Sequence, residues 1–339
     1  MIRGLYRFAL CALLATLPGA VLAQDGPEVF RNRTMPYDAF DRLLATKIAV
    51  ANAQFVIGFA PGELTLPRSA IVEWVADSAG TVSAYYGRFP VDHVRVLIVP
   101  GDGDKVRSGT AFAHRGAALR IVVGRDATRA SLAGDWIIVH ELTHLAFPDV
   151  ARPHHWIEEG LASYIEPIAR AQLGKFDAAD VWRQFVAGMP KGLPAAGDRG
   201  LDQTPTWGRT YWGGALFCLL ADVEIRERTH NRFGLQDALR AIVSAGGNME
   251  SHWPVTRAFE VGDAAVGVPV LMGLYERMKA TPEDVDLARL WRRLGVGVAG
   301  NTVVFDDSAP LASVRQAITR SPAVVRTRAA YPGGDTAAR

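Results

Sequence analysis

Cysteine is almost absent from this chain, which has only Cys11 and Cys218 among its 339 residues. Cys11 lies in an N-terminal segment that we expect to be removed. The mature protein would then keep one cysteine and form no intramolecular disulfide, even in an oxidising compartment. Cys218 lies in the apolar run 215–220, where we expect a buried, unreactive thiol. Disulfide-held scaffolds are therefore excluded, and the fold must depend on a hydrophobic core.

The N-terminus lacks the long apolar run of a membrane helix, which needs about 20 residues. Arg3 and Arg7 instead precede a shorter apolar run over residues 8–17, and a small-residue cleavage site follows at 21–23. This order of regions is typical of a secretory signal peptide. We predict that residues 1–23 are cleaved, that the protein is exported to the periplasm or the cell exterior, and that no integral membrane segment remains.

A strong excess of charge of either sign is also missing. The formal net charge is +2, so no basic field indicates nucleic acid or an anionic membrane as a partner. Hydrophobic residues make up 49% of the chain and charged residues 21%, which is typical of a globular protein with a sizeable core. The sequence has no internal repeat, and its length allows two lobes.

The first lobe, residues 24–130, combines strand patterns with one helical pattern. Apolar residues at helical spacing predict a helix from Pro67 to about Tyr86, and proline is favoured in a first helical turn. Short apolar runs, two of them closed by Pro-Gly turns, predict strands at 55–59, 93–99, 110–114 and 119–123. These patterns predict a lobe built on a small mixed sheet.

The second lobe, residues 131–300, has a helical pattern. The helical spacing continues from Ser131 to about Val296, with breaks expected at 190–205, 246–248 and Gly262. The stretch 301–339 would form a C-terminal extension with a loose tail from about residue 320, since that tail has few large apolar groups. The predicted fold class is therefore α+β, with a sheet lobe followed by a helical lobe.

The clearest chemical signal is His-Glu-x-x-His, formed by His140, Glu141 and His144 within the segment 136–145. Residues i and i+4 lie on one face of a helix, so both imidazoles can reach one zinc ion. Glu141 lies beside them, where it can polarise a bound water and act as general base. A catalytic zinc site has three protein ligands and an open fourth position. The motif therefore predicts zinc-dependent hydrolysis.

The rest of this segment argues against two histidines on a solvated helix face. The helix would be apolar nearly all round, through Ile137, Ile138, Val139, Leu142 and Leu145. Such a helix should be buried. Burying two histidines and a glutamate without partners costs several kcal/mol, and a bound metal ion removes this cost.

A third zinc ligand must come from elsewhere in the chain. A metzincin would have glycine at position 147 and histidine at 150, but the chain has Phe147 and Val150, so this class is excluded. Downstream, the stretch 156–166 reads Trp-Ile-Glu-Glu-Gly-Leu-Ala-Ser-Tyr-Ile-Glu. It resembles the gluzincin peptidases, especially the catalytic domain of aminopeptidase-N-like enzymes. The resemblance implies a thermolysin-like zincin with the active-site helix between the lobes, and Glu159 as the third ligand.

Two further residues acquire roles from the resemblance. Glu166 would be an outer-shell partner of a zinc histidine, where a carboxylate fixes the tautomer of the ring; the alternative is a surface carboxylate. Tyr211 lies in the segment 208–215, which looks like the Tyr-x-x-Gly-Ala segment of these enzymes. Its phenol would stabilise the tetrahedral intermediate; the alternative is a packing aromatic.

Three more polar residues are weaker candidates. His154 and His155 are alternative metal ligands, but the motif leaves them as cleft or loop histidines. Arg209 is a candidate for binding a substrate carboxylate, although a surface position is the simpler expectation.

The chain departs from the family pattern in two places. Fourteen residues separate His144 from Glu159, fewer than in those aminopeptidases. The family's Gly-Ala-Met-Glu-Asn strand, whose glutamate binds the free amine of the substrate, is missing, and the corresponding strand 108–114 has no acid. Glu158 is the nearest spare carboxylate, but it should project about 100° away from Glu159 and so out of the cleft. Cleavage of internal peptide bonds is therefore at least as well supported as aminopeptidase activity.

Together these patterns predict a secreted zinc metallopeptidase that acts on peptide or protein substrates. Glu141 would take the proton of a zinc-activated water, and Tyr211 would stabilise the oxyanion. The alternative is an exported zinc-binding protein of the same fold that acts as a binding module without turnover. The presence of Glu141 argues against that alternative, since structural zinc needs no base.

Overall fold

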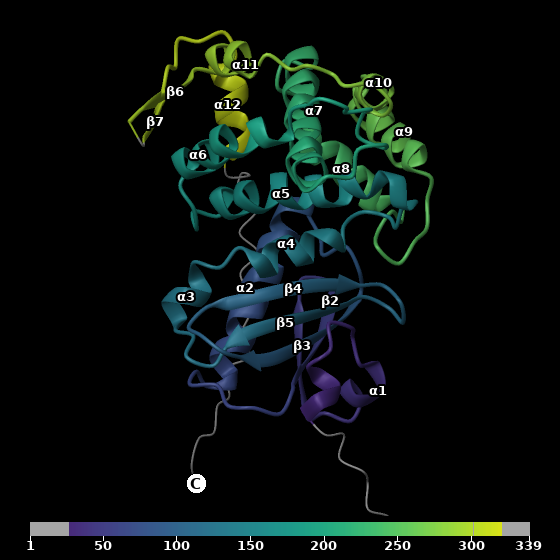
Figure 1. Ribbon diagram of the computed structural model, residues 1–339, viewed down its shortest axis with the longest axis vertical. Coiled ribbons are helices and arrows are strands. Elements are labelled where there is room, and N and C mark those ends of the chain that lie inside the picture. The colour runs from purple at the N-terminus through teal and green to yellow at the C-terminus, as the bar shows by residue number, and fades with distance from the viewer. Residues whose placement is uncertain (1–26, 301, 321–339) are drawn as a thin grey trace, which may run out of the picture.

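The computed structural model describes residues 27–300 and 302–320 (Figure 1). The predicted signal peptide, residues 1–23, lies outside the described residues, as does the predicted tail beyond residue 320. Within the described residues, no helix is long and apolar enough to cross a membrane. The chain forms a sheet lobe and a helical lobe, so the predicted α+β class is confirmed.

A five-stranded mixed sheet, in the order β1-β2-β3-β5-β4, forms the first lobe. Its strands are β1 (Ala45–Val50), β2 (Ala53–Phe59), β3 (His93–Gly101), β4 (Val106–Phe112) and β5 (Ala118–Gly124). The central strands β2, β3 and β5 are parallel, and the edge strands β1 and β4 are antiparallel to their neighbours. The four predicted strands are present, although β4 begins four residues before the predicted strand 110–114 and ends two residues before its end. β1 is not predicted, because its side chains are exposed or only half-buried and so give no clear apolar pattern.

One face of the sheet carries the main hydrophobic core. α2 (Arg68–Tyr86) packs there, as the helical spacing predicts, and α4 (Ile137–His144) contacts both α2 and β4. Phe55 and Ile57 of β2 point into this core, because alternate residues of a strand face the same side. The same apolar cluster continues through the helical lobe as far as Ile318 near the C-terminal end of the described residues. The two lobes therefore share one core.

The N-terminal segment covers part of the opposite face of the sheet. Its short helices are η1 (Pro27–Phe30) and α1 (Tyr37–Phe40). They bring Phe30 and Phe40 into a second, small apolar cluster with Leu97 of β3. This segment therefore shields part of the outer face of the sheet.

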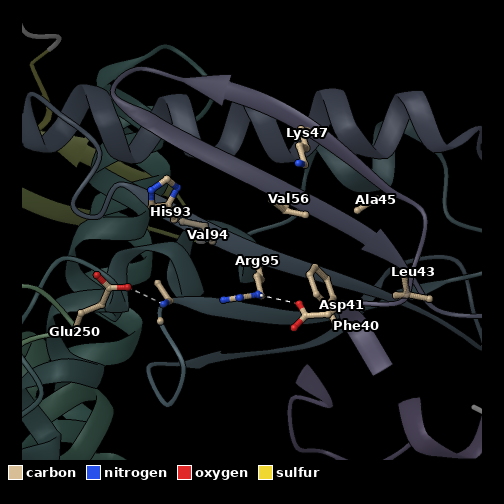
Figure 2. A pocket seen from close by; sticks show the side chains of 12 residues that line it. Phe40, Asp41, Leu43, Ala45, Lys47, Val56, His93, Val94, Arg95 and Glu250 are labelled. Carbon is tan, nitrogen blue, oxygen red and sulfur yellow. Dashed lines mark hydrogen bonds and ion pairs between the residues drawn. The ribbon is translucent and has the colours of Figure 1, made fainter. Parts of the chain in front are cut away.

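Beside this cluster, a hollow of about 500 Å³ lies over β1, β2 and β3 (Figure 2). The Nε atom of Arg95 lies 3.5 Å from Oδ1 of Asp41 in an ion pair. The carboxylate of Glu250 accepts a hydrogen bond of 2.9 Å from the backbone N–H of Ala117. These contacts join the N-terminal segment and a distant loop to the sheet. The predicted metal ligands lie elsewhere, since α4 packs on the other face.

The second lobe is built of helices, with α4 lying between the sheet and α5 (Figure 1). Its helices are α3 (Arg129–Ala133), α4, α5 (His155–Gln172), α6 (Ala178–Gly188), α7 (Gly214–Arg228), α8 (Leu235–Ser244), α9 (Val255–Val266), α10 (Leu271–Met278), α11 (Leu287–Leu294) and α12 (Ala312–Thr319). Shorter helical turns are η2 (Arg152–His154), η3 (Met189–Gly192) and the π-helical η4 (Gly208–Gly213).

One expectation for this lobe is wrong, and one element that follows it is not predicted. Gly262 does not break the helical pattern: it lies inside α9, where the side chain of Leu271 packs against it, and the helix ends at Gly267 with a positive φ. A hairpin of β6 (Val296–Ala299) and β7 (Thr302–Phe305) follows α11. It escapes the prediction because its strands are short and several of their apolar side chains face solvent.

Candidate metal centre

The helix α4 carries His140, Glu141 and His144. At its start, the carboxylate of Asp135 accepts a hydrogen bond of 3.1 Å from the backbone N–H of Ile138, which satisfies one of the free N–H groups of the first turn. Ile138 itself is fully buried. The helix is packed on the sheet side and on the α5 side, so the burial that its apolar residues predict is confirmed.

The helix α5 brings Glu159 to the same place and contacts α7 through two glycines. A Cβ atom on Gly160 would lie 2.3 Å from the backbone carbonyl carbon of Gly214, so the two backbones can approach this closely only without side chains. Gly214 directly follows η4, which carries Tyr211. The glycines of the two sequence motifs therefore hold those motifs side by side.

His140, His144 and Glu159 converge on one point. The Nε2 atoms of His140 and His144 lie 3.2 Å and 3.7 Å from Oε2 of Glu159, and the three candidate ligand atoms lie within 4.8 Å of one another. Tetrahedral zinc with bonds of about 2.1 Å needs ligand atoms about 3.4 Å apart. The spacing and the donor set therefore fit one zinc ion, and three ligands leave its fourth position open.

The protonation states of these ligands also suit a metal. Burial raises the pKa of the Glu159 carboxyl, but hydrogen bonds from His140 and His155 and the charges of the histidines lower it further, so the net pKa is well below the usual range. Burial, helped by the charge of His140, lowers the pKa of His144 to about 4. Near neutral pH the site therefore presents a carboxylate and a neutral imidazole, the forms that bind zinc.

Glu141 lies beside the ligands, against β4. A Cβ atom on Gly109 of β4 would lie 2.4 Å from Cγ of Glu141, so glycine is needed there to make room for the acid. Burial and the charge of Glu159 raise the pKa of Glu141 to about 7, although the charge of His140 acts in the opposite direction. A carboxyl group that titrates near neutrality suits proton transfer. The role of Gly109 depends on how β4 packs on α4 and is not visible in the sequence.

Tyr211 joins the site from the other side. Its ring stacks on that of His140, with centroids 6.3 Å apart and planes 14° from parallel. Burial and the nearby Glu159 carboxylate, which accepts a hydrogen bond from the phenol, raise the pKa of Tyr211 to about 12. The phenol therefore keeps its proton near neutral pH and remains a hydrogen-bond donor.

Glu166 is not the surface carboxylate of the alternative expectation. It is buried on α5, and its Oε1 atom lies 2.6 Å from the guanidinium of Arg170. Burial raises the pKa of Glu166 to about 7, against the lowering effects of Arg170 and of His140. Its carboxylate therefore lies within electrostatic reach of His140, but its close contact is the ion pair with Arg170. The outer-shell role of Glu166 stays a prediction.

Two of the weaker candidates lie away from the ligands. Nδ1 of His154 lies 3.1 Å from the carboxylate of Asp202, which also accepts a hydrogen bond from the indole of Trp156. Arg209 is buried, and its Nε atom lies 2.8 Å from Asp198 in an ion pair. The expected surface position of Arg209 is therefore wrong, and its guanidinium is committed to the loop before η4.

A pocket of about 320 Å³ opens over the ligands. It is lined by Gly109, Thr110, Ala111, His140, Glu141, His144, His155, Glu158, Glu159, Tyr211 and Met249. Met249 comes from the loop after α8, about a hundred residues beyond His144 in the chain. No pattern in the sequence predicts that it lines the pocket.

The expectation that Glu158 points away from the cleft is wrong. It lies in the first turn of α5, and its carboxylate lines the pocket, where Oε2 lies 2.8 Å from Nδ1 of His155. The helical offset of about 100° from Glu159 holds, but the pocket is wide enough to include both side chains. The hydrogen bond with Glu158 is the main cause that raises the pKa of His155, to about 10.

Sequence comparisons give no family for this chain: no protein-family profile matches it, and neither does any curated protein. Comparison of structures gives a fold. An aminopeptidase N family protein from Idiomarina loihiensis superposes with a TM-score of 0.55 at 13% identity, over 75% of this chain and 49% of that one. An M1 zinc metallopeptidase from Deinococcus radiodurans gives a TM-score of 0.46 at 18% identity, over 71% and 53%.

The chain therefore spans about half the length of these solved structures. At 13% identity, the likeness to the Idiomarina protein shows a shared fold and nothing finer. The predicted resemblance to aminopeptidase-N-like proteins is confirmed at that level. The thermolysin-like assignment stays a prediction.

Proposed function

We propose that this protein is a zinc metallopeptidase. The observation that carries the proposal is the convergence of His140, His144 and Glu159, whose ligand atoms lie within 4.8 Å of one another in a pocket that Glu141 also lines. Structural zinc requires no neighbouring base and no open pocket. A fold shared with an aminopeptidase N family protein supports the same reaction class.

In this proposal each side chain has one task. Zinc held by His140, His144 and Glu159 would supply Lewis acidity toward the scissile carbonyl and acidify a water molecule. Glu141 takes the proton of the attacking water and later delivers it to the leaving amine, for which its raised pKa is suited. The Tyr211 phenol donates a hydrogen bond to the oxygen that becomes negatively charged.

The substrate class in the proposal is a peptide or protein outside the cytoplasm. Residues 1–23 support the export part of the proposal, because a basic start, an apolar run and a small-residue cleavage site follow one another as in a signal peptide.

A mixed peptide library tests the reaction. Purified mature protein should produce new fragments, which mass spectrometry detects, and a strong zinc chelator should suppress them until zinc is added back. Fragments formed equally well with the chelator would contradict a zinc mechanism. A protein that binds zinc stoichiometrically but cleaves no peptide would instead support the binding module without turnover.

We also propose that internal peptide bonds are substrates. The pocket wall from β4 has no acid, and Glu158, the spare acid of the pocket, is engaged by His155. We therefore expect N-terminal acetylation of a good substrate to change kcat/KM by less than about threefold. A charge-assisted contact to a free amine would be worth about 1.5–3 kcal/mol, so its loss would lower kcat/KM by tenfold or more.

Matched free and acetylated peptides of one sequence provide the measurement. If acetylation abolishes cleavage, the protein recognises a free amine after all. Glu158→Gln would then identify the acid, because it should weaken cleavage of the free peptide alone.

A further inference from the structure

His155 is a pocket residue that the proposed reaction does not use. It begins α5 and precedes Glu159 by four residues, so both side chains lie on the same helix face. Its side chain is about half exposed. Its ring nevertheless faces inward with both nitrogens near carboxylates, which distinguishes it from an ordinary surface histidine.

The two oxygens of Glu159 face different partners. Oε2 faces the candidate ligands, at 3.2 Å from His140 and 3.7 Å from His144. Oε1 lies 3.4 Å from Nε2 of His155. Oε2 is therefore available to a metal ion, while Oε1 is in contact with the imidazole of His155.

The orientation of the His155 ring is itself fixed. Its second nitrogen, Nδ1, lies 2.8 Å from Oε2 of Glu158. The contacts form a continuous series from Glu158 through the imidazole to Glu159. An outer-shell partner that is held in this way fixes the rotation of a ligating carboxylate.

We propose that His155 is a positioning residue for the metal: its Nε2–H donates to Oε1 of Glu159 and keeps Oε2 turned toward zinc, while Glu158 fixes the imidazole. The inference rests on the proposed zinc site. His155 itself is not a ligand, because the set of ligand atoms that lie within 4.8 Å of one another comprises His140, His144 and Glu159.

Two substitutions separate the hydrogen bond from the bulk of the ring. In His155→Gln the side-chain amide nitrogen reaches about as far as Nε2 and can donate to Glu159, whereas His155→Leu retains the bulk and removes the donor. Zinc affinity is measured by competition with a chromophoric chelator, and the visible absorption of the cobalt-substituted protein reports the geometry of the ligands.

We expect His155→Leu to weaken zinc binding by about 10–100-fold and to change the cobalt spectrum. His155→Gln should restore affinity to within about fivefold of the parent. His252→Leu is the matched control: it removes another exposed histidine that pairs with a carboxylate, that of Asp149, and should leave both readouts unchanged.

Unchanged zinc affinity in His155→Leu would overturn the inference, as would failure of His155→Gln to restore it. A loss as complete as that caused by removing His144 would also overturn it, because His155 would then be a ligand. A parent protein without zinc would contradict the metal centre itself. A parent that binds zinc but cleaves no peptide would contradict only the proposed reaction, since neither readout depends on turnover.

Discussion

The His140→Ala protein should purify with less than about 0.1 zinc per chain, where the parent should hold about one. His140 offers one of the three candidate ligand atoms, and its Nε2 atom lies 3.2 Å from Oε2 of Glu159. Two remaining protein ligands do not hold zinc against dilution. Peptidase activity should be lost together with the metal, which elemental analysis of the purified protein measures.

His144→Ala should behave in the same way, and Glu159→Gln should weaken binding. His154→Asn is a matched control, since asparagine keeps a donor for Asp202 and the variant should retain its zinc. Stoichiometric zinc in the double variant His140→Ala/His144→Ala would show that the metal is held elsewhere and would remove the basis of the proposed function.

Glu141→Gln should lower kcat/KM by about 10²–10⁴-fold while leaving zinc content and fold unchanged. Glutamine has nearly the same shape as glutamate, so it fits the space that Gly109 leaves beside α4. The amide cannot accept the proton of the attacking water. The side chain is not among the three ligand atoms, so the metal should stay bound.

Steady-state kinetics and zinc content, measured on the same preparation, separate the two effects. Activity within a few-fold of the parent would mean that another group activates the water, and the metal assignment would stand. Loss of zinc in this variant would instead show that Glu141 supports the ligands.

The candidate metal ligands can be predicted from the sequence because zinc chemistry requires ligands at a local spacing. Two histidines four residues apart on a helix share a face whatever the surrounding fold, and the motif around Glu159 adds the third ligand by resemblance. The apolar residues of α4 also predict the burial that makes uncompensated histidines costly. Ligand spacing and apolar pattern are both properties of short segments. The fold brings these segments together and leaves their local helical geometry unchanged.

Other features of the site depend on contacts between distant segments. Glu158 lines the pocket because the pocket is wide. Helical geometry alone does not predict that width. The sequence predicts a surface position for Arg209, because its burial depends on an ion pair with Asp198 in a separate loop. Met249 and Gly109 likewise acquire their places from packing. The strands of the sheet lobe are predictable where burial produces an apolar pattern, and β1 is missed because it has no such pattern.

Because η4 is a π-helical turn, the direction of the Tyr211 side chain depends on the number of residues in this segment. Hydrogen bonds in such a turn span one residue more than in an α-helix. Deleting a single residue between Tyr211 and α7 would let the turn relax into regular helix and rotate the phenol by about 100°, away from the ring of His140. The helix α7 and its glycine contact with α5 would remain. In this segment the number of residues, as well as their identity, therefore determines where the Tyr211 phenol points.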